Sequence, residues 1–356
     1  MILVNNPGEE LASYWPLQHS KWNGWTPTDL IFPFFLFIVG VAMAFSFGSR
    51  LQQGESRRRL LGHVLWRGLL IFAIGIFLNG FPNRFHLHSL RIYGVLPRIA
   101  VCYVITALFE LWSDWRTHLA VIVACLVGYW CLMRYVPVPG FGIPTHAIPL
   151  LDPDRNIAAW LDRKVLAGHL YEGTRDPEGI LSTIPAVATS LLGLLTGKWI
   201  RSARGGLAKT IAMVFAGSLL ILLGEAVNPW FPINKKLWTS SFVLLTAGLA
   251  LVCLALCYWV ADVKRWRAWW TKPFLVFGMN AIAAYICAAV LADILDRLQF
   301  SFPGAGVMSW QELLYERCFR PYANPANASL LYAATFVLIC WTAMWLLYRK
   351  GIFLKI

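Results

Sequence analysis

Long apolar runs dominate the chain, and short polar connections separate them. The apolar runs cover residues 29–49, 64–80, 92–112, 117–135, 180–200, 210–226, 237–260, 273–298 and 329–348. A helix of roughly 20 predominantly apolar residues crosses the hydrocarbon core of a bilayer. The pattern therefore predicts an all-α, polytopic helical membrane protein with about nine full transmembrane helices.

Residues 1–5 are too few to cross a bilayer, and we interpret them as the end of an N-terminal helix, a stub. The rest of the chain contains no obvious second soluble domain, low-complexity tract or repeat. We therefore expect residues 1–356 to form a single integral membrane domain. A short helix is also expected over residues 308–319, lying at the membrane interface.

Basic residues cluster in four connections, and the alternation of the nine spans brings all four clusters to one side. The clusters are Arg50 with 57–59, the basic residues of 198–209, those of 264–272, and Arg349, Lys350 and Lys355. Basic loops mark the cytoplasmic side, so the C-terminus is expected there. His19 and the segments 136–179 and 299–328 are then extracytoplasmic. The 136–179 segment is either a solvated loop or a lid over a polar substrate.

Composition agrees with a membrane protein, since the 356 residues are 58% hydrophobic and 14% charged. The formal net charge of +13 could indicate nucleic-acid binding, but the basic residues lie in short loops and no nucleic-acid motif accompanies them. No nucleic-acid partner is predicted. Seven of the eight cysteines lie in apolar runs, which argues against a disulfide framework. His86 and His88 lack further ligands nearby in sequence, so no metal is predicted.

Candidate chemistry concentrates just before the first full span. His19 can accept a proton near neutral pH or act as a nucleophile, although a histidine in a loop is more often simply solvated. Asp29 opens the span, where it can cap the helix, orient an imidazole, or do both. Asn5 lies near membrane depth and can either pack helices together or donate a hydrogen bond to a developing oxyanion.

Two arginines stand near the start of the span expected at residues 92–112. Arg91 can reach the interface, whereas Arg98 lies deeper, where a charge is costly and usually faces a polar cavity or a partner. A guanidinium suits phosphate and carboxylate groups. Arg98 is therefore either a ligand-binding residue or one half of an ion pair with Asp293 or Asp296.

Several ordered stretches resemble the heparan-α-glucosaminide N-acetyltransferase family and its bacterial relatives. They are Val4–Gly8, His19 with Trp22-Asn23-Gly24, Asp29-Leu-Ile-Phe-Pro33, Arg91 to Ala100, Asp176 to Ala186, Asn228 to Ser241 and Pro273 to Tyr285. The resemblance implies multi-pass proteins that use acetyl-CoA to acetylate an amino sugar. It implies His19 as the catalytic histidine and Asn5 as a family asparagine. It also implies that this chain begins inside the family's first helix.

The resemblance extends to the expected binding residues. Arg98 is assigned to a CoA tunnel, together with Arg91 and Asn280, although Asn280 can also merely bridge helices. For the sugar we expect Trp22, Asn23, Asp176 and Glu178, because aromatic faces, amides and carboxylates suit hydroxyl-bearing rings. Asn228, Asn234, Ser182 and Thr183 each have a purely structural alternative in turns or helix ends.

The resemblance therefore implies an acetyl-CoA-dependent N-acetyltransferase in a membrane, and we expect it in the bacterial inner membrane. Acetyl-CoA would come from the cytoplasm, the acceptor would be an extracytoplasmic glucosamine-type sugar, and His19 would be acetyl carrier or general base. Two alternatives stay open: a proton-coupled amino-sugar transporter, and an acyltransferase for cell-wall or exopolysaccharide sugars. The predicted partners are acetyl-CoA, an amino sugar or glycan acceptor and the lipid bilayer, and a homodimer is compatible with the sequence.

Overall fold

The computed structural model describes residues 1–82, 85–302 and 306–354, which fold into two compact units. The central unit contains Lys21–Trp25 and Asp29–Trp266. The terminal unit contains Met1–Ser20, Thr26–Thr28 and the chain from Arg267 onward. Lys355 of the fourth basic cluster and residues 303–305 of the outer segment 299–328 lie outside the described residues.

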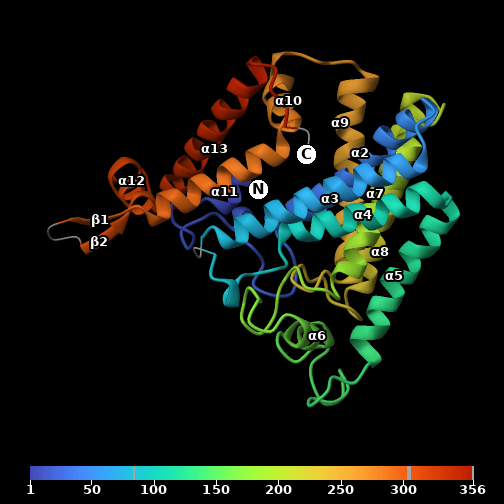
Figure 1. Cartoon of the computed structure of the whole chain (residues 1–356), viewed down its shortest axis with the longest axis horizontal. Helices are drawn as coiled ribbons and strands as arrows, with labels where there is room; N and C mark the ends of the chain where they lie inside the picture. The colour runs from blue at the N-terminus through green and yellow to red at the C-terminus, as the bar shows by residue number, and fades with distance from the viewer. Residues whose placement is uncertain (83–84, 303–305, 355–356) are drawn as a thin grey trace. The chain divides into compact units, whose positions relative to one another are not determined.

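Long helices make up most of the central unit (Figure 1). They are α2 (Ile31–Gln52), α3 (Arg57–Gly80), α4 (Val95–Trp112), α5 (Trp115–Tyr135), α7 (Thr183–Arg201), α8 (Gly206–Val227) and α9 (Ser240–Tyr258), with the short outer helix α6 (Ile157–Val165) between α5 and α7. A 3-10 turn, Pro27–Leu30, leads into α2, another covers Leu87–Ser89, and a π-helical turn, Trp259–Val263, extends α9.

Glycines set the closest helix contacts in the central unit. A Cβ atom at Gly193 of α7 would meet the backbone carbonyl of Phe37 in α2, and one at Gly40 of α2 would meet the carbonyl of Ser190. Small residues allow helix backbones in a membrane to approach this closely. Farther along, Gly197 of α7 lies against Val41 of α2, and Gly48 of α2 lies against Arg201 at the end of α7, so α2 and α7 run parallel.

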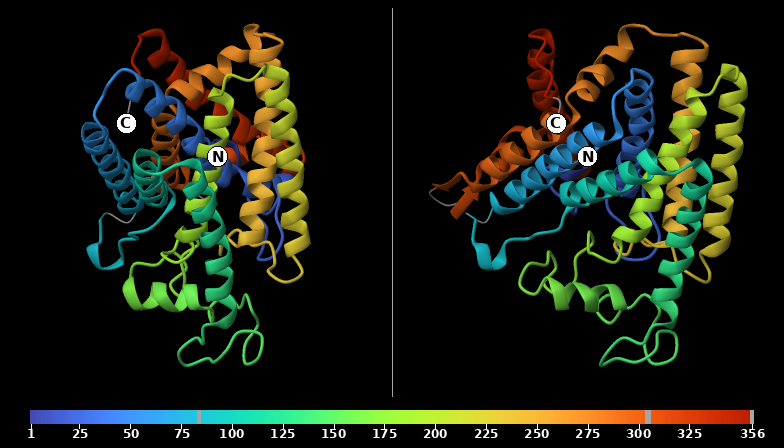
Figure 2. Two further views of the ribbon diagram at one scale, coloured as in Figure 1. Left: turned by 90° about the vertical axis from the view of Figure 1, so that its right-hand side faces the viewer. Right: turned by 45° about the vertical axis from the view of Figure 1, so that its right-hand side comes forward.

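The other long helices pack as antiparallel neighbours. Gly75 of α3 lies against Pro97 of α4, and Gly217 of α8 lies against Gly248 of α9. Helices α8 and α9 are side by side in both views of Figure 2. The starts of α2, α4, α7 and α9 consequently share one end of the unit, called here the site end. Arg50, Lys198 and Lys264 lie at the opposite end, as the predicted alternation of spans requires.

The terminal unit joins the first residues of the chain to the last helices. It contains α1 (Ile2–Asn5), turns at Trp15–Leu17, Trp269–Thr271 and Arg320–Tyr322, α10 (Lys272–Met279), α11 (Ala281–Arg297), α12 (Trp310–Cys318) and α13 (Pro325–Arg349). A two-stranded antiparallel hairpin, β1 (Gln299–Phe302) and β2 (Gly306–Ser309), precedes α12 (Figure 1).

The helix pattern confirms the predicted all-α, polytopic membrane fold, with two corrections. Among the described residues, eight helices are long and apolar enough to span a membrane. The expected single span at 273–298 is instead a broken pair, α10 and α11, bent by 76° next to Asn280. The short helix expected at 308–319 is α12, and the expected stub is α1.

The outer segment 136–179 is not the solvated loop that was one of its two interpretations. Val138, Ile148, Leu151 and Ile157 are buried in a core cluster with Tyr129, Met133, Phe231 and Leu237. Burial of these apolar side chains removes them from water and stabilises the segment against α5 and the turn before α9. The segment is therefore a packed cover on the central unit.

Candidate functional site

A buried ion pair lies at the site end of the central unit. The carboxylate of Asp29 is completely buried, and the ammonium of Lys235 lies 3.1 Å from its Oδ1. Asp29 is in the 3-10 turn that leads into α2, and Lys235 is in the connection between α8 and α9. Burial lowers the pKa of Lys235, although the charge of Asp29 opposes that shift. The structure thus gives Asp29 a charged partner in addition to its predicted place at the start of a helix.

Asn234 joins this connection to the segment that follows His19. Its Nδ2 donates to the carbonyl oxygen of Trp22 and to Oδ1 of Asn23, at 3.1 Å each. Its Oδ1 accepts from the backbone N–H of Leu237 at 2.9 Å. The Asn234 side chain is fully buried, and its bond to Leu237 is buried, whereas the bonds to Trp22 and Asn23 are partly buried. The turn role expected for Asn234 is confirmed, and the contact with Trp22 and Asn23 is new.

Trp238 forms the centre of the site end. It has a φ of +52°, in the left-handed region that a bulky residue rarely adopts. The buried indole packs edge-on against Phe32 of α2 and Phe242 of α9, and its Nε1 donates to Thr189 of α7. Strained backbone of this kind persists only where the surrounding structure enforces it, and it clusters at functional sites.

Arg98 lies beside Trp238 in the first turn of α4 and is fully buried. Its guanidinium lies 5.1 Å from the centre of the Trp238 ring, and Nη2 donates to the Gly179 carbonyl and to Oγ of Ser182. Nε and Nη1 are buried without a hydrogen-bond partner among the described residues. Asp293 and Asp296, the two acids considered as its ion-pair partners, belong to the terminal unit, where Asp293 pairs with Arg297. Arg98 therefore retains donors for an oxygen-rich ligand group.

Arg91, by contrast, is saturated by acids of the outer segment. Its Nε and Nη2 donate to the two oxygens of Asp176 at 2.8 and 2.6 Å, and Nη2 also lies 2.5 Å from Glu178. The ring of Tyr171 packs on its guanidinium. Burial would lower the pKa of Arg91, but the hydrogen bond to Asp176 and the charges of Glu178 and Asp176 raise it overall. These contacts make Arg91, Asp176 and Glu178 one cross-link.

A small cavity lies between Trp22 and the outer segment. Its walls are Trp22, Ala158, Ala159, Asp162, Arg175, Asp176, Pro177, Ser182, Lys236 and Leu237, and it has room for about one water molecule. Asp162 of α6 accepts a hydrogen bond from the backbone N–H of Ile180 at 2.9 Å. Burial raises the pKa of Asp162 to about 6. Sequence reasoning had not selected Asp162, because nothing in the local pattern distinguishes it from the other acids of the segment.

Cations cover the Trp22 ring. The Arg175 guanidinium and the Lys236 ammonium lie 5.2 and 6.0 Å from its centre, and both pair with Glu172. The Trp22 indole Nε1 donates to the carbonyl of Leu151 at 2.8 Å. Trp22 is therefore fixed in position and presents an aromatic surface that is partly occupied by protein side chains.

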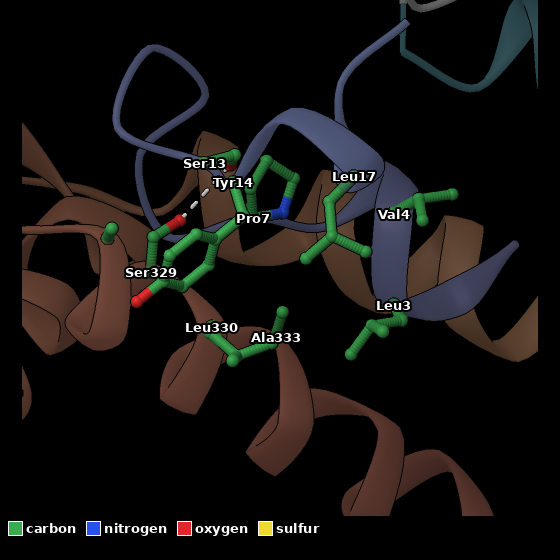
Figure 3. Close-up of a pocket in the computed structure, with 10 residues that line it drawn as sticks. Leu3, Val4, Pro7, Ser13, Tyr14, Leu17, Ser329, Leu330 and Ala333 are labelled. Atoms are coloured by element: carbon green, nitrogen blue, oxygen red, sulfur yellow. Dashed lines mark hydrogen bonds between the residues drawn. The ribbon is translucent and has the colours of Figure 1, made fainter. Parts of the chain in front are cut away.

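The terminal unit holds the remaining predicted residues. His19 is exposed, and Asn5 is exposed at the end of α1. The turn before His19 is held by Thr26, whose Oγ1 donates to the Gln18 carbonyl at 2.6 Å. A pocket between this N-terminal segment and α13 is lined by apolar residues with Ser13, Tyr14 and Ser329 (Figure 3). The Oγ atoms of Ser13 and Ser329 are 3.4 Å apart.

Asn280 stands at the break between α10 and α11 and is almost completely buried. Its Nδ2 donates to the Ile352 carbonyl at 3.2 Å, and its Oδ1 accepts from the Leu354 N–H at 2.9 Å. The amide thus fixes the chain that follows α13. This geometry favours the helix-bridging alternative for Asn280, and its predicted role toward CoA stays a prediction.

The structure brings some predicted residues together and separates others between units. Trp22 and Asn23 meet at Asn234, and Arg91, Asp176 and Glu178 form one cluster. Asn5, His19 and Asn280 belong to the terminal unit, and the other predicted site residues belong to the central unit. Lys235, Trp238 and Asp162 are the site-end residues that sequence reasoning missed. Lys235 could have been identified as a candidate site residue from its position inside a polar motif before an apolar run.

No group of three or more His, Cys, Asp or Glu side chains within residues 1–82, 85–302 and 306–354 is arranged to hold a metal ion. Oxygen-binding capacity at the site end comes instead from Arg98, and charge balance comes from Asp29 with Lys235. The donor set suits an organic ligand with carbonyl or phosphate oxygens.

Comparison with known proteins adds a second line of evidence. A family model described as heparan-alpha-glucosaminide N-acetyltransferase, catalytic, matches residues 11–226. The chain is 30% identical over 415 residues to the heparan-alpha-glucosaminide N-acetyltransferase of Mus musculus, and 31% identical over 412 residues to that of Homo sapiens. Each alignment covers 100% of this chain and 58% of the relative, so the chain spans a little over half the length of these relatives.

Proposed function

Since the chain belongs to the heparan-alpha-glucosaminide N-acetyltransferase family, we propose that it is a transmembrane acetyltransferase. It would move the acetyl group of acetyl-CoA to the amine of a glucosamine-type sugar. The observation that carries this proposal is the similarity to enzymes of that name along the whole chain. A buried, charged site end on an otherwise apolar bundle supports it, because charges inside membrane proteins usually serve function.

The reaction breaks the thioester C–S bond and forms an amide C–N bond. The CoA thiolate leaves and takes up a proton, and the acceptor ammonium must lose one proton before its nitrogen can attack. His19 can serve in two ways that the proposal leaves open. It either carries the acetyl group transiently on an imidazole nitrogen, or it removes the proton from the amine for direct transfer.

Asp29 and Asn5 complete the proposed catalytic group. A carboxylate beside an imidazole orients the ring and stabilises its protonated form, which is the role proposed for Asp29. Asn5 would donate to the thioester carbonyl oxygen as negative charge develops on it. The complete burial of the Asp29 carboxylate supports a fixed orientation.

Arg98 is the residue proposed to hold acetyl-CoA. The fit rests on Nε and Nη1, which are buried without a hydrogen-bond partner among the described residues. An amide, thioester or phosphate oxygen would satisfy these donors, and leaving such groups unpaired costs about 1–3 kcal/mol each. Arg91 and Asn280 were expected to share this role. We now propose that they act mainly by fixing the outer segment and the end of α13.

For the acceptor sugar we propose Trp22, Asn23, Asp176 and Glu178 as residues near its binding place. The cavity lined by Trp22 and Asp176 supports this placement. Because that cavity is far smaller than a sugar, the acceptor would enter only after the outer segment moves away from Trp22. Arg175, Lys236 and Glu172 would then separate, exposing the indole face to the sugar ring.

The proposal also assigns the two substrates to opposite sides. The basic clusters at the end opposite the site end support a cytoplasmic position for that end, and acetyl-CoA would come from the cytoplasm. The acceptor would bind on the extracytoplasmic side, with the bacterial inner membrane as the proposed location. A homodimer is compatible with this arrangement.

One observation favours a second candidate, a proton-coupled amino-sugar transporter. The Asp29–Lys235 pair is a buried set of ionisable groups at the end of a bundle, and such groups serve proton coupling in transporters. An acyltransferase that acts on cell-wall or exopolysaccharide sugars is the same chemistry with another acceptor. The enzyme and the transporter make different predictions in one experiment.

The experiment measures transfer from radiolabelled acetyl-CoA to glucosamine by purified protein, with and without the substitution His19→Ala. His146→Ala serves as the matched control, because His146 is an exposed histidine of the outer segment that lies in no proposed site. We expect transfer by the wild type and the control and its loss in His19→Ala. Equal transfer by all three would remove His19 from the mechanism. Glucosamine accumulation in proteoliposomes without acetylation would support the transporter instead.

A further inference from the structure

At the site end, the Lys235 ammonium meets the Asp29 carboxylate at hydrogen-bond distance. The Nζ–Oδ1 distance is 3.1 Å, the Asp29 side chain is fully buried, and the Lys235 side chain is 21% exposed. We propose that Lys235 is a positioning residue for acetyl transfer, which holds the Asp29 carboxylate ionised and oriented at the start of α2. This inference rests on the proposed function.

Hydrogen bonds on both sides of Lys235 hold its backbone in place. The Lys235 carbonyl accepts from the Trp238 N–H at 3.1 Å, which closes a turn that includes the left-handed Trp238. On the other side, Gly24 N–H donates to the Ile233 carbonyl at 2.8 Å, and Asn234 binds Trp22 and Asn23. Both ends of the turn are therefore fixed, which holds the Lys235 backbone within reach of Asp29.

The ring of Trp238 connects the pair to the rest of the site end. It contacts Phe32, three residues after Asp29 in the chain, and the Arg98 guanidinium. A displacement of the turn would consequently move the start of α2 and Arg98 together. Lys235 thus lies within the same rigid group as the residue proposed to hold acetyl-CoA.

Charge balance explains why Asp29 requires a cation. Lys235 is faced by Asp29 from the start of α2, by Glu178 from the turn before α7, and by its neighbour Lys236. Glu178 is already paired with Arg91, and Lys236 with Glu172. A buried carboxylate that loses a nearby cation ionises less readily, whatever other contacts it makes. Removal of Lys235 would therefore favour protonated Asp29, which cannot stabilise an imidazolium.

The test compares Lys235→Met and Lys235→Arg with Lys164→Met as the matched control, because Lys164 is an exposed lysine of α6 outside the proposed site. Steady-state acetyl transfer from acetyl-CoA to glucosamine is measured between pH 5 and 9 for each variant. For Lys235→Met we expect kcat to fall about tenfold or more, with KM values changed by less than about threefold. We also expect its acidic limb to move up by about one pH unit.

Two further variants separate positioning from loss of folding. Lys235→Arg should restore most of kcat and return the acidic limb toward the wild-type position, since it replaces the positive charge. Asp29→Asn should lower kcat, and adding Lys235→Met to it should produce little further loss, because interacting residues are not additive. Size-exclusion profiles and thermal unfolding of each purified variant show whether it is folded.

The outcomes distinguish this inference from the proposed function. A Lys235→Met protein that is folded and keeps the wild-type acidic limb and kcat would overturn the inference while leaving acetyl transfer intact. Lys235→Arg that fails to recover kcat, although it is folded, would also overturn it, and so would an equal effect of Lys164→Met. Absence of transfer by the wild type would overturn both proposals together.

Discussion

Arg98 and Arg91 provide the sharpest contrast in the structure, because both are arginines at the start of α4 and only one is saturated. The perturbation is Arg98→Met, with Arg91→Met as its comparison. Arg91 has three short contacts to Asp176 and Glu178, whereas Arg98 has two hydrogen bonds and two buried nitrogens without a partner among the described residues. The first arrangement stabilises the fold, and the second leaves two donors for the ligand group proposed above.

The expected magnitudes follow from these contacts. Arg98→Met loses two charge-assisted hydrogen bonds of about 1.5–3 kcal/mol each and a stack on Trp238 of about 2 kcal/mol. It regains about 1–3 kcal/mol for each unpartnered nitrogen and several kcal/mol of guanidinium desolvation. The losses of about 5–8 kcal/mol and the gains cover similar ranges, so we expect a smaller net destabilisation than for Arg91→Met. Arg91→Met leaves the buried Asp176 carboxylate unpaired, which costs about 3–5 kcal/mol.

The assay is thermal unfolding of purified protein together with kcat/KM for acetyl-CoA. We expect Arg98→Met to change the melting temperature by less than about 5 °C and to lower kcat/KM by about 100-fold or more. Arg91→Met should lower the melting temperature by a larger amount. The reasoning is refuted if Arg98→Met unfolds as early as Arg91→Met while its folded fraction keeps the wild-type kcat/KM.

Three other substitutions test separate parts of the structure. Asp162→Asn keeps an acceptor for Ile180 but removes a carboxyl whose pKa rises from 3.8 to about 6 on folding. The native carboxyl favours the folded state below about pH 4 and loses that advantage as pH rises through 6. The free energy of unfolding of the variant should therefore exceed that of the wild type by up to about 3 kcal/mol above pH 6. Melting curves at pH 4.5 and 7.5 check this, and equal shifts at both pH values would contradict it. Asn234→Ala removes the three hydrogen bonds of a buried side chain and should lower the free energy of unfolding by about 3 kcal/mol. Faster tryptic cleavage after Lys21 is the local readout. Unchanged cleavage and an unchanged melting temperature would show that the contact is dispensable. Gly193→Ala places a methyl group against the Phe37 carbonyl and should lower the free energy of unfolding by about 1–3 kcal/mol. In the control Gly128→Ala the added methyl group meets open space, so α5 should not be destabilised. The same melting temperature for both variants would argue against close α2–α7 packing.

The sequence by itself determined the spans and the kind of chemistry. Runs of about 20 apolar residues have one stable solution in a bilayer, because only a helix satisfies its own backbone hydrogen bonds there. The polar motifs between the runs could also be recognised from their residue types and their order along the chain alone. Asp29 at a helix start and Asn234 in a turn are local properties, and the structure has both where the sequence predicted them.

Contacts between distant segments could not be predicted in the same way. Lys235 lies 206 positions from Asp29, and their pairing depends on the packing of α2 against α9 and on the left-handed turn at Trp238. Arg91 and Arg98 look alike in sequence, yet only the fold of residues 176–182 gives one three acidic contacts and leaves the other with free donors. The 76° bend at Asn280 escaped the hydropathy pattern, because both halves remain apolar.

Hydrophobicity and local propensity therefore decide where helices form and which polar segments lie between them, since each depends on residues close together in the chain. The partner of each buried charge is decided only when helices pack, because burial and distance fix whether a charge is paired, orphaned or shared. For this protein the sequence determined a membrane bundle with an acetyltransferase-like polar end. The tertiary structure decided that Lys235 pairs with Asp29, that Arg91 pairs with Asp176 and Glu178, and that two nitrogens of Arg98 are buried without a hydrogen-bond partner among the described residues.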